Sequence, residues 1–149
     1  MWNANSVKSK KSELANFLPI NNLDNGAISE TKLAPKHRFS MSGYRVYRAD
    51  RNQFGGAVML LVKNNVHHDQ FVLPNFFNLE TIAVCLYLQN NTRLLFLSCC
   101  NPPDSTILHS DLDSVVSSFD SVFLVDDLKC KHTAWNCISV DRNGRILLS

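Results

Sequence analysis

Two short stretches of the chain place a carboxylate directly after apolar residues. In the first, Ile28 precedes Glu30, and in the second, Leu124 and Val125 precede Asp127. Each stretch has the pattern of a short strand, so each carboxylate is expected at the rim of a sheet. Two acidic groups at one rim can hold a divalent cation and position a water molecule. A bound cation and a positioned water are the least that hydrolysis of a phosphodiester requires.

The composition is that of a globular chain with a weak positive charge. Of its 149 residues, 45% are hydrophobic and 19% are charged, and the net charge is +2. These values exclude a disordered chain and predict one domain with a real core. The net charge alone does not indicate nucleic acid. Basic clusters at 8–11, 36–38 and 45–51 could neutralise phosphates, but composition alone favours a solvated face.

Targeting and cysteine patterns predict an intracellular protein with no membrane partner. Residues 1–11 lack the apolar region of a signal peptide, and the apolar stretch Phe54–Val62 is too short to span a bilayer. Five cysteines in no disulfide-like pattern favour a reducing compartment. Cys130, His132 and Cys137 lack CxxC spacing and a fourth ligand, so free thiols are favoured over a zinc site.

Hydrophobic periodicity predicts the elements that must position the carboxylates. Strands are predicted at 26–30, 44–48, 56–62, 79–88, 93–100 and 121–125, with a hairpin turn at 89–92. A helix is predicted at 8–18 and another at 107–119, and the second would bury Leu108, Leu112, Val115, Val116 and Phe119. His67 and His68 are expected at the surface. Paired strands with helices before and after predict a layered α/β fold.

The order of short motifs resembles the endonuclease domain of jockey-type non-LTR retrotransposons, of the exonuclease–endonuclease–phosphatase superfamily. The matching segments are 2–5 to the family's WNANG, 28–33 to ISETHL, 47–58 to YRxDR…GGGVA, 79–84 to LExVAV, 98–103 to SAYNPP, 125–135 to AGDLNAKHxxW and 142–145 to RNGR. The last two favour the retrotransposon branch over sphingomyelinases or inositol phosphatases.

The resemblance implies a four-layered α/β sandwich of the endonuclease/exonuclease/phosphatase type. Two mixed sheets would lie face to face with helices outside, and the active site would lie at one end between the sheets. The family's domain also continues past RNGR to a late SDH motif that supplies a catalytic Asp and His. We therefore expect residues 1–149 to form a single partial domain, incomplete at its C-terminal end.

The resemblance also assigns roles to residues. Glu30 matches the Glu that binds the catalytic Mg²⁺, and Asn3 matches an Asn beside the metal and the scissile phosphate. Asp127 matches the Asp that orients or deprotonates the attacking water. Arg142 and Arg145 could touch phosphate, or could lie on a solvated turn. The implied partner is DNA, with nuclear localisation if the protein acts on it; no small-molecule cofactor is implied, and the oligomeric state stays open.

Three departures from the family's pattern predict impaired chemistry. Lys129 replaces an Asn, can only donate hydrogen bonds, and brings positive charge to the expected metal. Cys100 replaces a Tyr whose hydroxyl bonds the phosphate, and losing one such donor typically costs about 10²–10³ in rate. Asp126 replaces a glycine and would be strained if the backbone there needed a positive φ.

Three functions therefore stay open. The first is the reverse-transcriptase-associated endonuclease domain of a retrotransposon polyprotein, ancestrally a Mg²⁺-dependent DNA-nicking phosphodiesterase and weak or inactive here. The second is a non-catalytic nucleic-acid-binding pseudoenzyme. The third is another phosphodiesterase or phosphatase of the superfamily, which the KHTAW and RNGR motifs disfavour. For His132 and Trp135 we favour a loop anchored by a buried Trp over packing near DNA.

Overall fold

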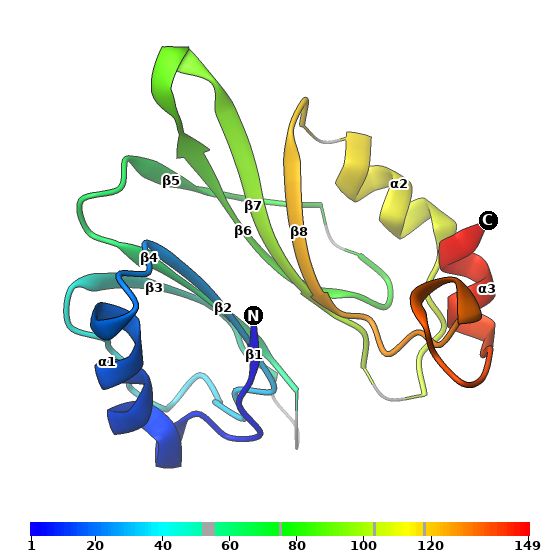
Figure 1. Cartoon of the computed structure of the whole chain (residues 1–149), viewed down its shortest axis with the longest axis horizontal. Helices are drawn as coiled ribbons and strands as arrows, with labels where there is room; N and C mark the ends of the chain where they lie inside the picture. The colour runs from blue at the N-terminus through cyan, green and yellow to red at the C-terminus, as the bar shows by residue number, and fades with distance from the viewer. Residues whose placement is uncertain (52–55, 75, 103, 118) are drawn as a thin grey trace.

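Two four-stranded sheets lie face to face in the computed structural model, with helices on their outer faces (Figure 1). The structure describes residues 1–51, 56–74, 76–102, 104–117 and 119–149. Phe54, Gly55 and Pro103, which belong to stretches named above, lie outside the described residues, as does the side chain of Asp126. This arrangement is the predicted four-layered sandwich.

Sheet A is built from the first 63 residues and has the strand order β1-β2-β4-β3. Its strands are β1 (Trp2–Asn3), β2 (Asn25–Ser29), β3 (Tyr44–Ala49) and β4 (Val58–Lys63). The short strand β1 runs parallel to β2, and β4 runs antiparallel to both β2 and β3. The central strand β4 is buried on both faces from Val58 to Val62, as its continuous apolar run predicts.

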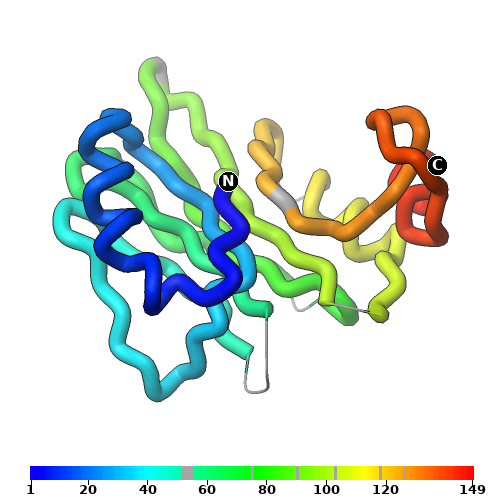
Figure 2. Tube along the Cα trace, turned by 60° about the horizontal axis from the view of Figure 1, so that its bottom comes forward, coloured from blue at the N-terminus to red at the C-terminus, as the bar shows by residue number. Residues whose placement is uncertain are grey.

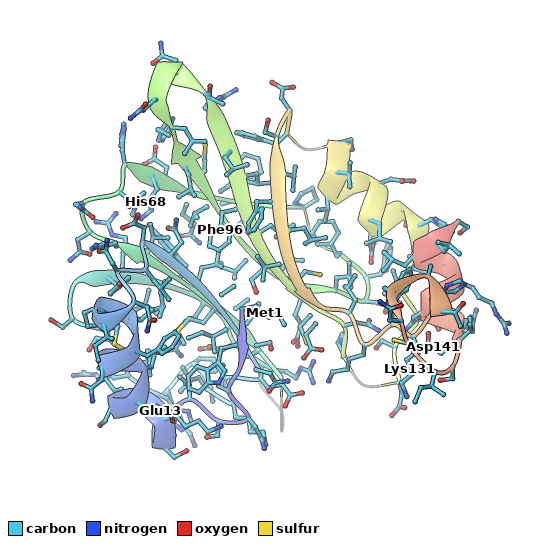
Figure 3. All side chains as sticks on the ribbon, viewed as in Figure 1. Met1, Glu13, His68, Phe96, Lys131 and Asp141 are labelled. Carbon is cyan, nitrogen blue, oxygen red and sulfur yellow. The ribbon has the colours of Figure 1, made fainter. Side chains whose placement is uncertain are left out.

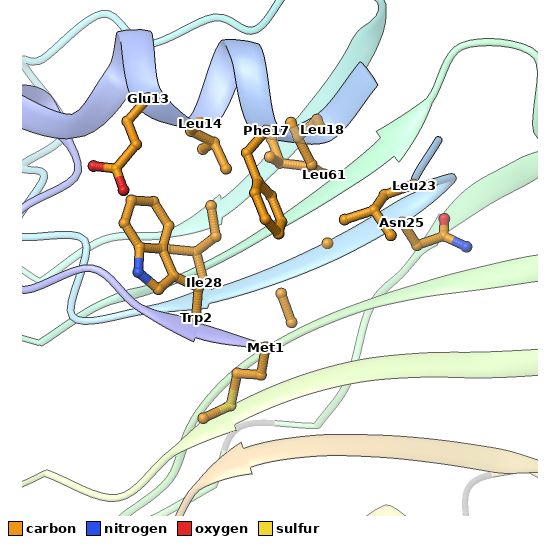
Figure 4. A pocket seen from close by; sticks show the side chains of 12 residues that line it. Met1, Trp2, Glu13, Leu14, Phe17, Leu18, Leu23, Asn25, Ile28 and Leu61 are labelled. Carbon is orange, nitrogen blue, oxygen red and sulfur yellow. The ribbon is translucent and has the colours of Figure 1, made fainter. Parts of the chain in front are cut away.

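Helix α1 (Lys11–Ile20) covers the outer face of sheet A after a short 3-10 turn. Its Leu14 and Leu18 are buried against Met59 and Leu61 of the sheet. The predicted helix at 8–18 is thus present, with Pro19 lying inside its last turn. A pocket of about 350 Å³ remains between α1 and the β1–β2 edge (Figure 4). Its described lining is mostly apolar.

Sheet B has the strand order β5-β6-β7-β8. Its strands are β5 (His68–Phe71), β6 (Glu80–Tyr87), β7 (Arg93–Cys100) and β8 (Val122–Asp127). Strands β6 and β7 form the predicted hairpin, and β8 lies parallel to β7. Helices α2 (His109–Ser117) and α3 (Arg142–Leu148) lie on the outer side of this sheet (Figure 1).

The main core lies between the two sheets and corrects one expectation about the surface. Val84 and Phe96 of sheet B belong to the same buried cluster as Leu60 of sheet A. His68, which is labelled in Figure 3, is buried and not exposed as predicted, because β5 places its ring edge-on to that of Tyr47, with ring centroids 5.6 Å apart. No helix within the described ranges is long and apolar enough to cross a membrane.

Helix α2 buries fewer residues than its sequence predicts. It begins at His109, and Val115 is buried against sheet B with Leu112 and Phe119 nearby. Val116, expected to face inward, is 66% exposed. The residue after Val115 on a helix is rotated by about 100°, which takes it off the narrow face that contacts the sheet.

Candidate functional site

Strand pairing brings the predicted carboxylates to one end of the sandwich. In sheet A, Asn3 lies opposite Ser29 in the parallel pair β1–β2, so Glu30 follows at the same end. In sheet B, Cys100 lies opposite Asp127 in the parallel pair β7–β8. The two ends meet, because the Asn3 Nδ2 donates to Asp127 Oδ2 at 3.1 Å. Figures 1 and 2 show the N-terminus, which leads into β1, on the side of sheet A that faces sheet B.

Glu30 directly follows β2 and has an uncommon backbone conformation. Its φ is +51°, in the left-handed region, and its carbonyl accepts from the Ser6 amide at 2.9 Å. A non-glycine residue held there costs about 1–3 kcal/mol, and such residues cluster at functional sites. Because the backbone turns sharply at this point, the side chain of Glu30 faces sheet B and is only 24% exposed.

Lys129 reaches the same carboxylate from the other sheet. Its Nζ lies 3.3 Å from Glu30 Oε1, and the Lys129 side chain is 35% exposed. Lys129 also has a left-handed backbone, with φ of +52°. The sequence correctly identified a positive charge near Glu30, but it did not predict that the two groups form an ion pair across the sheets.

The surroundings keep Glu30 ionised. Burial raises the pKa of Glu30, but hydrogen bonds from Asn3 and Lys129, together with the charges of Lys129 and Lys32, outweigh it and lower the pKa below its usual value. The Asn3 amide thus serves both carboxylates, Glu30 and Asp127. Glu30 is therefore a carboxylate at neutral pH, with the Lys129 Nζ 3.3 Å away and the Asn3 amide between it and Asp127.

Cys100 lies beside this group as a buried thiol. It is 1% exposed, and burial, aided by the charge of Asp127, raises its pKa to about 11 despite the opposing charge of Lys129. A neutral thiol is a weak donor and neither a good nucleophile nor a metal ligand. Its Sγ donates to the Asn101 carbonyl at 3.7 Å. Cys100 therefore lacks the reach of a tyrosine hydroxyl toward an outside phosphate.

Glu80 and Arg51 form a second ion pair near the site that the sequence did not single out. The guanidinium of Arg51 contacts the Glu80 carboxylate, which also accepts from the Ala57 amide at 3.1 Å. Glu80 lies opposite Cys100 in the β6–β7 pair. The pair ties the segment before β4 to sheet B. The signal was present in the sequence, because Glu80 belongs to the LExVAV match and Arg51 to YRxDR.

A divalent cation does not fit the side chains as they lie. Mg²⁺ requires near-octahedral oxygen ligands at about 2.0–2.1 Å. Within the described part of the chain, no three His, Cys, Asp or Glu side chains group as a metal site. The Lys129 ammonium already contacts Glu30. At ~4 Å and an effective dielectric of ~20, its repulsion of a divalent ion is about 8 kcal/mol before solvent screening.

In the part of the chain that the structure describes, Cys130, His132 and Cys137 do not group with a further His, Cys, Asp or Glu as a metal site. Trp135 is not the buried anchor that we favoured, because it is 37% exposed. Its Nε1 donates to the Cys130 carbonyl at 3.2 Å, and its ring lies 5.2 Å from that of His132. The loop is thus held by a hydrogen bond from the indole side chain to a backbone carbonyl, and the indole stays partly exposed.

Arg142 and Arg145 lie on helix α3, not on a solvated turn. Asp141 caps the helix by accepting from the Gly144 amide at 2.7 Å. Both arginines are exposed. Arg142 and Lys129 line one hollow of about 230 Å³ beside Asn101. The structure thus places one of the two arginines next to the carboxylate site.

Comparison with solved structures confirms the fold. The endonuclease domain of TRAS1, a telomere-specific non-LTR retrotransposon, superposes with a TM-score of 0.71 at 17% identity, covering 99% of this chain and 65% of that domain. A humanized Danio rerio TDP2 gives 0.57 at 11% identity, covering 91% of this chain and 66% of that one. A truncated Caenorhabditis elegans TDP2 superposes with a TM-score of 0.51 at 14% identity, covering 94% of this chain and 64% of that one.

The chain therefore has the predicted fold of the exonuclease–endonuclease–phosphatase type and spans 65% of the length of the TRAS1 domain. Neither a protein-family model nor a curated protein matches the sequence.

Proposed function

We propose that the chain is an endonuclease-type domain of a jockey-type non-LTR retrotransposon in which phosphodiester hydrolysis is weak or lost. One observation supports this most strongly. Asn3, Glu30 and Asp127 meet at one end of the two sheets, yet Lys129 pairs with Glu30. The similarity to the TRAS1 endonuclease domain supports the same class. The ancestral reaction would be the nicking of one DNA strand to expose a 3′ hydroxyl.

In this scheme each retained residue has a limited task. Asp127 would accept a proton from the attacking water, and Asn3 would hold that carboxylate in place through its amide. Glu30, to which the resemblance assigns the catalytic Mg²⁺, is instead paired with Lys129 and does not fit the metal in this arrangement. The Lys129 ammonium opposes metal binding, and the buried Cys100 thiol cannot replace the phosphate-bonding hydroxyl. Several supports of the transition state are therefore weakened together.

A plasmid assay tests the proposal. The purified chain, incubated with supercoiled DNA and Mg²⁺, should nick no faster than buffer. Glu30→Ala serves as the matched inactive control, because any genuine activity at this site must fall with it. Rapid nicking that Glu30→Ala abolishes would show a fully active enzyme and overturn the proposal that hydrolysis is weak or lost.

A second candidate function is DNA binding without catalysis. It is favoured by Lys129 and Arg142, which line one hollow at the site, and by the exposed Arg145 on the same helix. When cationic side chains contact phosphates, the logarithm of the DNA-binding constant falls linearly with the logarithm of the salt concentration. The slope is about −0.9 for each phosphate contacted. Duplex binding measured from low to high salt should therefore be steep, and Arg142→Gln with Arg145→Gln should flatten the slope. Binding that is independent of salt contradicts this function.

A further inference from the structure

We infer that the Lys129 ammonium occupies the position where a divalent cation would bind. The site can then bind a phosphate group without a metal ion. Its Nζ lies 3.3 Å from Glu30 Oε1, in direct contact with the carboxylate that a cation would need. Lys129 also lines the hollow next to the site, together with Arg142. Lys129 therefore contacts the acidic group and also lines a hollow in which it and Arg142 face the carboxyl residues Asp104 and Asp141.

Among the described side chains that act on Glu30 or Asp127, two positive charges face two negative ones. Glu30 and Asp127 carry two negative charges, joined through the Asn3 amide. Lys129 and Lys32 bring two positive charges that both act on Glu30, and Lys32 is held by the side-chain oxygen of Asn5. A divalent ion placed here would meet two ammonium groups beside the two carboxylates. It would have to displace Lys129 from Glu30 before it could bind.

The fold holds Lys129 in this position. Leu128, directly before it, is 3% exposed in the cluster under α2, which anchors the chain at that point. The left-handed turn at Lys129, with φ of +52°, then directs the side chain back toward sheet A. Asparagine tolerates this conformation better than lysine does, so the position can be changed to Asn without added backbone strain.

Direct metal binding tests the inference. Mn²⁺ binding to the full chain is measured by the loss of the free-ion electron paramagnetic resonance signal. We expect weak binding by the natural chain and at least tenfold tighter binding by Lys129→Asn. The gain should vanish in Lys129→Asn combined with Glu30→Gln. Lys131→Asn removes the same charge two residues away and should bind no better than the natural chain.

The outcomes separate clearly. Equal Mn²⁺ affinity of the natural chain and Lys129→Asn would overturn the inference, as would a gain that persists when Glu30 is neutralised. Lys129→Met repeats the comparison without the ammonium and with the methylene stem kept. It guards against a misfolded Asn variant, and the folding of every variant is checked by thermal melting. An Mn²⁺-dependent rise in melting temperature that appears only when the ammonium is removed supports the inference independently.

The biological meaning rests on the proposed function, and a separate assay addresses it. A short DNA duplex should bind the natural chain equally, within about twofold, in EDTA and in Mg²⁺ at matched ionic strength. Lys129→Asn should bind more weakly in EDTA and recover in Mg²⁺. Natural-chain binding that requires Mg²⁺ overturns the inference. Absence of DNA binding under all conditions would overturn the proposed function while leaving the Mn²⁺ result standing.

Discussion

The amide of Asn3 bonds the carboxylate of Asp127 at 3.1 Å, across a sequence separation of 124 residues. Together with the Lys129–Glu30 ion pair, it joins the site end of sheet A to that of sheet B. Asn3 also lowers the pKa of Glu30, so one neutral side chain organises two acidic ones. A hydrogen bond of this kind contributes about 0.5–1.5 kcal/mol to the free energy of unfolding. It also fixes the relative position of the two side chains.

Replacing Asn3 should therefore have a small, measurable effect on stability. Asn3→Ala is expected to lower the free energy of unfolding by about 0.5–1.5 kcal/mol, because both carboxylates lose a donor. Asn3→Asp should lower it further by adding a like charge next to Asp127. Urea unfolding measures both variants. Asn16→Ala, on the exposed face of α1, is the control. An equal decrease in the free energy of unfolding there would show that the Asn3 contacts do not stabilise the protein.

The stability of the protein should depend on Glu30 in acid. The folded-state pKa of Glu30 lies below the ordinary value of 4.5. The folded state therefore binds its proton less readily than the unfolded chain does, and the stabilisation present above that value is lost as pH falls through the folded pKa. In the Glu30→Gln variant, this part of the decrease in the free energy of unfolding at low pH should disappear. Parallel pH dependences of urea unfolding in the two proteins, between about pH 6 and pH 3, would contradict the shift.

Cysteine labelling should follow burial. Cys100 is 1% exposed with a pKa of about 11, so its thiolate is scarce and shielded at pH 8. Cys130 and Cys137 are only partly buried. We expect iodoacetamide to modify these two before Cys100 in the folded chain, and all at similar rates in urea. Mass spectrometry of peptides after timed labelling gives the order, and early modification of Cys100 would show that the end of β7 opens to solvent.

The edge of sheet B should promote self-association. Strand β8 ends the strand order of this sheet, and its Phe123 is 56% exposed although it stacks on Phe96. An edge strand with an exposed aromatic residue invites pairing with another chain. We expect the isolated chain to elute from a sizing column in a concentration-dependent manner, or to show a broad thermal transition. Phe123→Lys should shift elution toward the monomer.

Val116→Lys is the matched control for that experiment. It places the same charge on another exposed apolar residue, but on helix α2, where no strand edge is available. An equal effect of the two variants would point to general solubility and not to the strand edge. A sharp monomeric peak and a cooperative melt of the natural chain would contradict the prediction altogether.

Continuous apolar runs were the most predictable parts of the fold. Strand β7 has the predicted bounds, Arg93–Cys100, because a polar turn and Asn101 mark its two ends. Strand β5 was missed because His68-Asp69-Gln70-Phe71 has little apolar character, and its pairing with β6 alone makes it a strand. Val116 and Trp135 were placed wrongly for one reason: an apolar residue is buried only where a partner surface lies opposite it.

The site was predictable as a set of positions but not as a set of contacts. The motif order brought Asn3, Glu30 and Asp127 to one end because strand direction fixes where each strand finishes. The ion pair of Lys129 with Glu30 depends on two left-handed backbone turns, at residues whose types give no hint of them. Neither turn contains glycine, so the usual sequence signal for a positive φ was missing.

The two sheets are also separate in the order of synthesis. Sheet A uses residues 2–63 and sheet B residues 68–127. A chain emerging from the ribosome can therefore pair all of sheet A while sheet B is still being translated. In that interval the inner face of sheet A, with Leu60 and Tyr47, has no partner and depends on the speed of elongation or on a chaperone for protection. The carboxylate site can close only after Asp127 and Lys129 have left the exit tunnel.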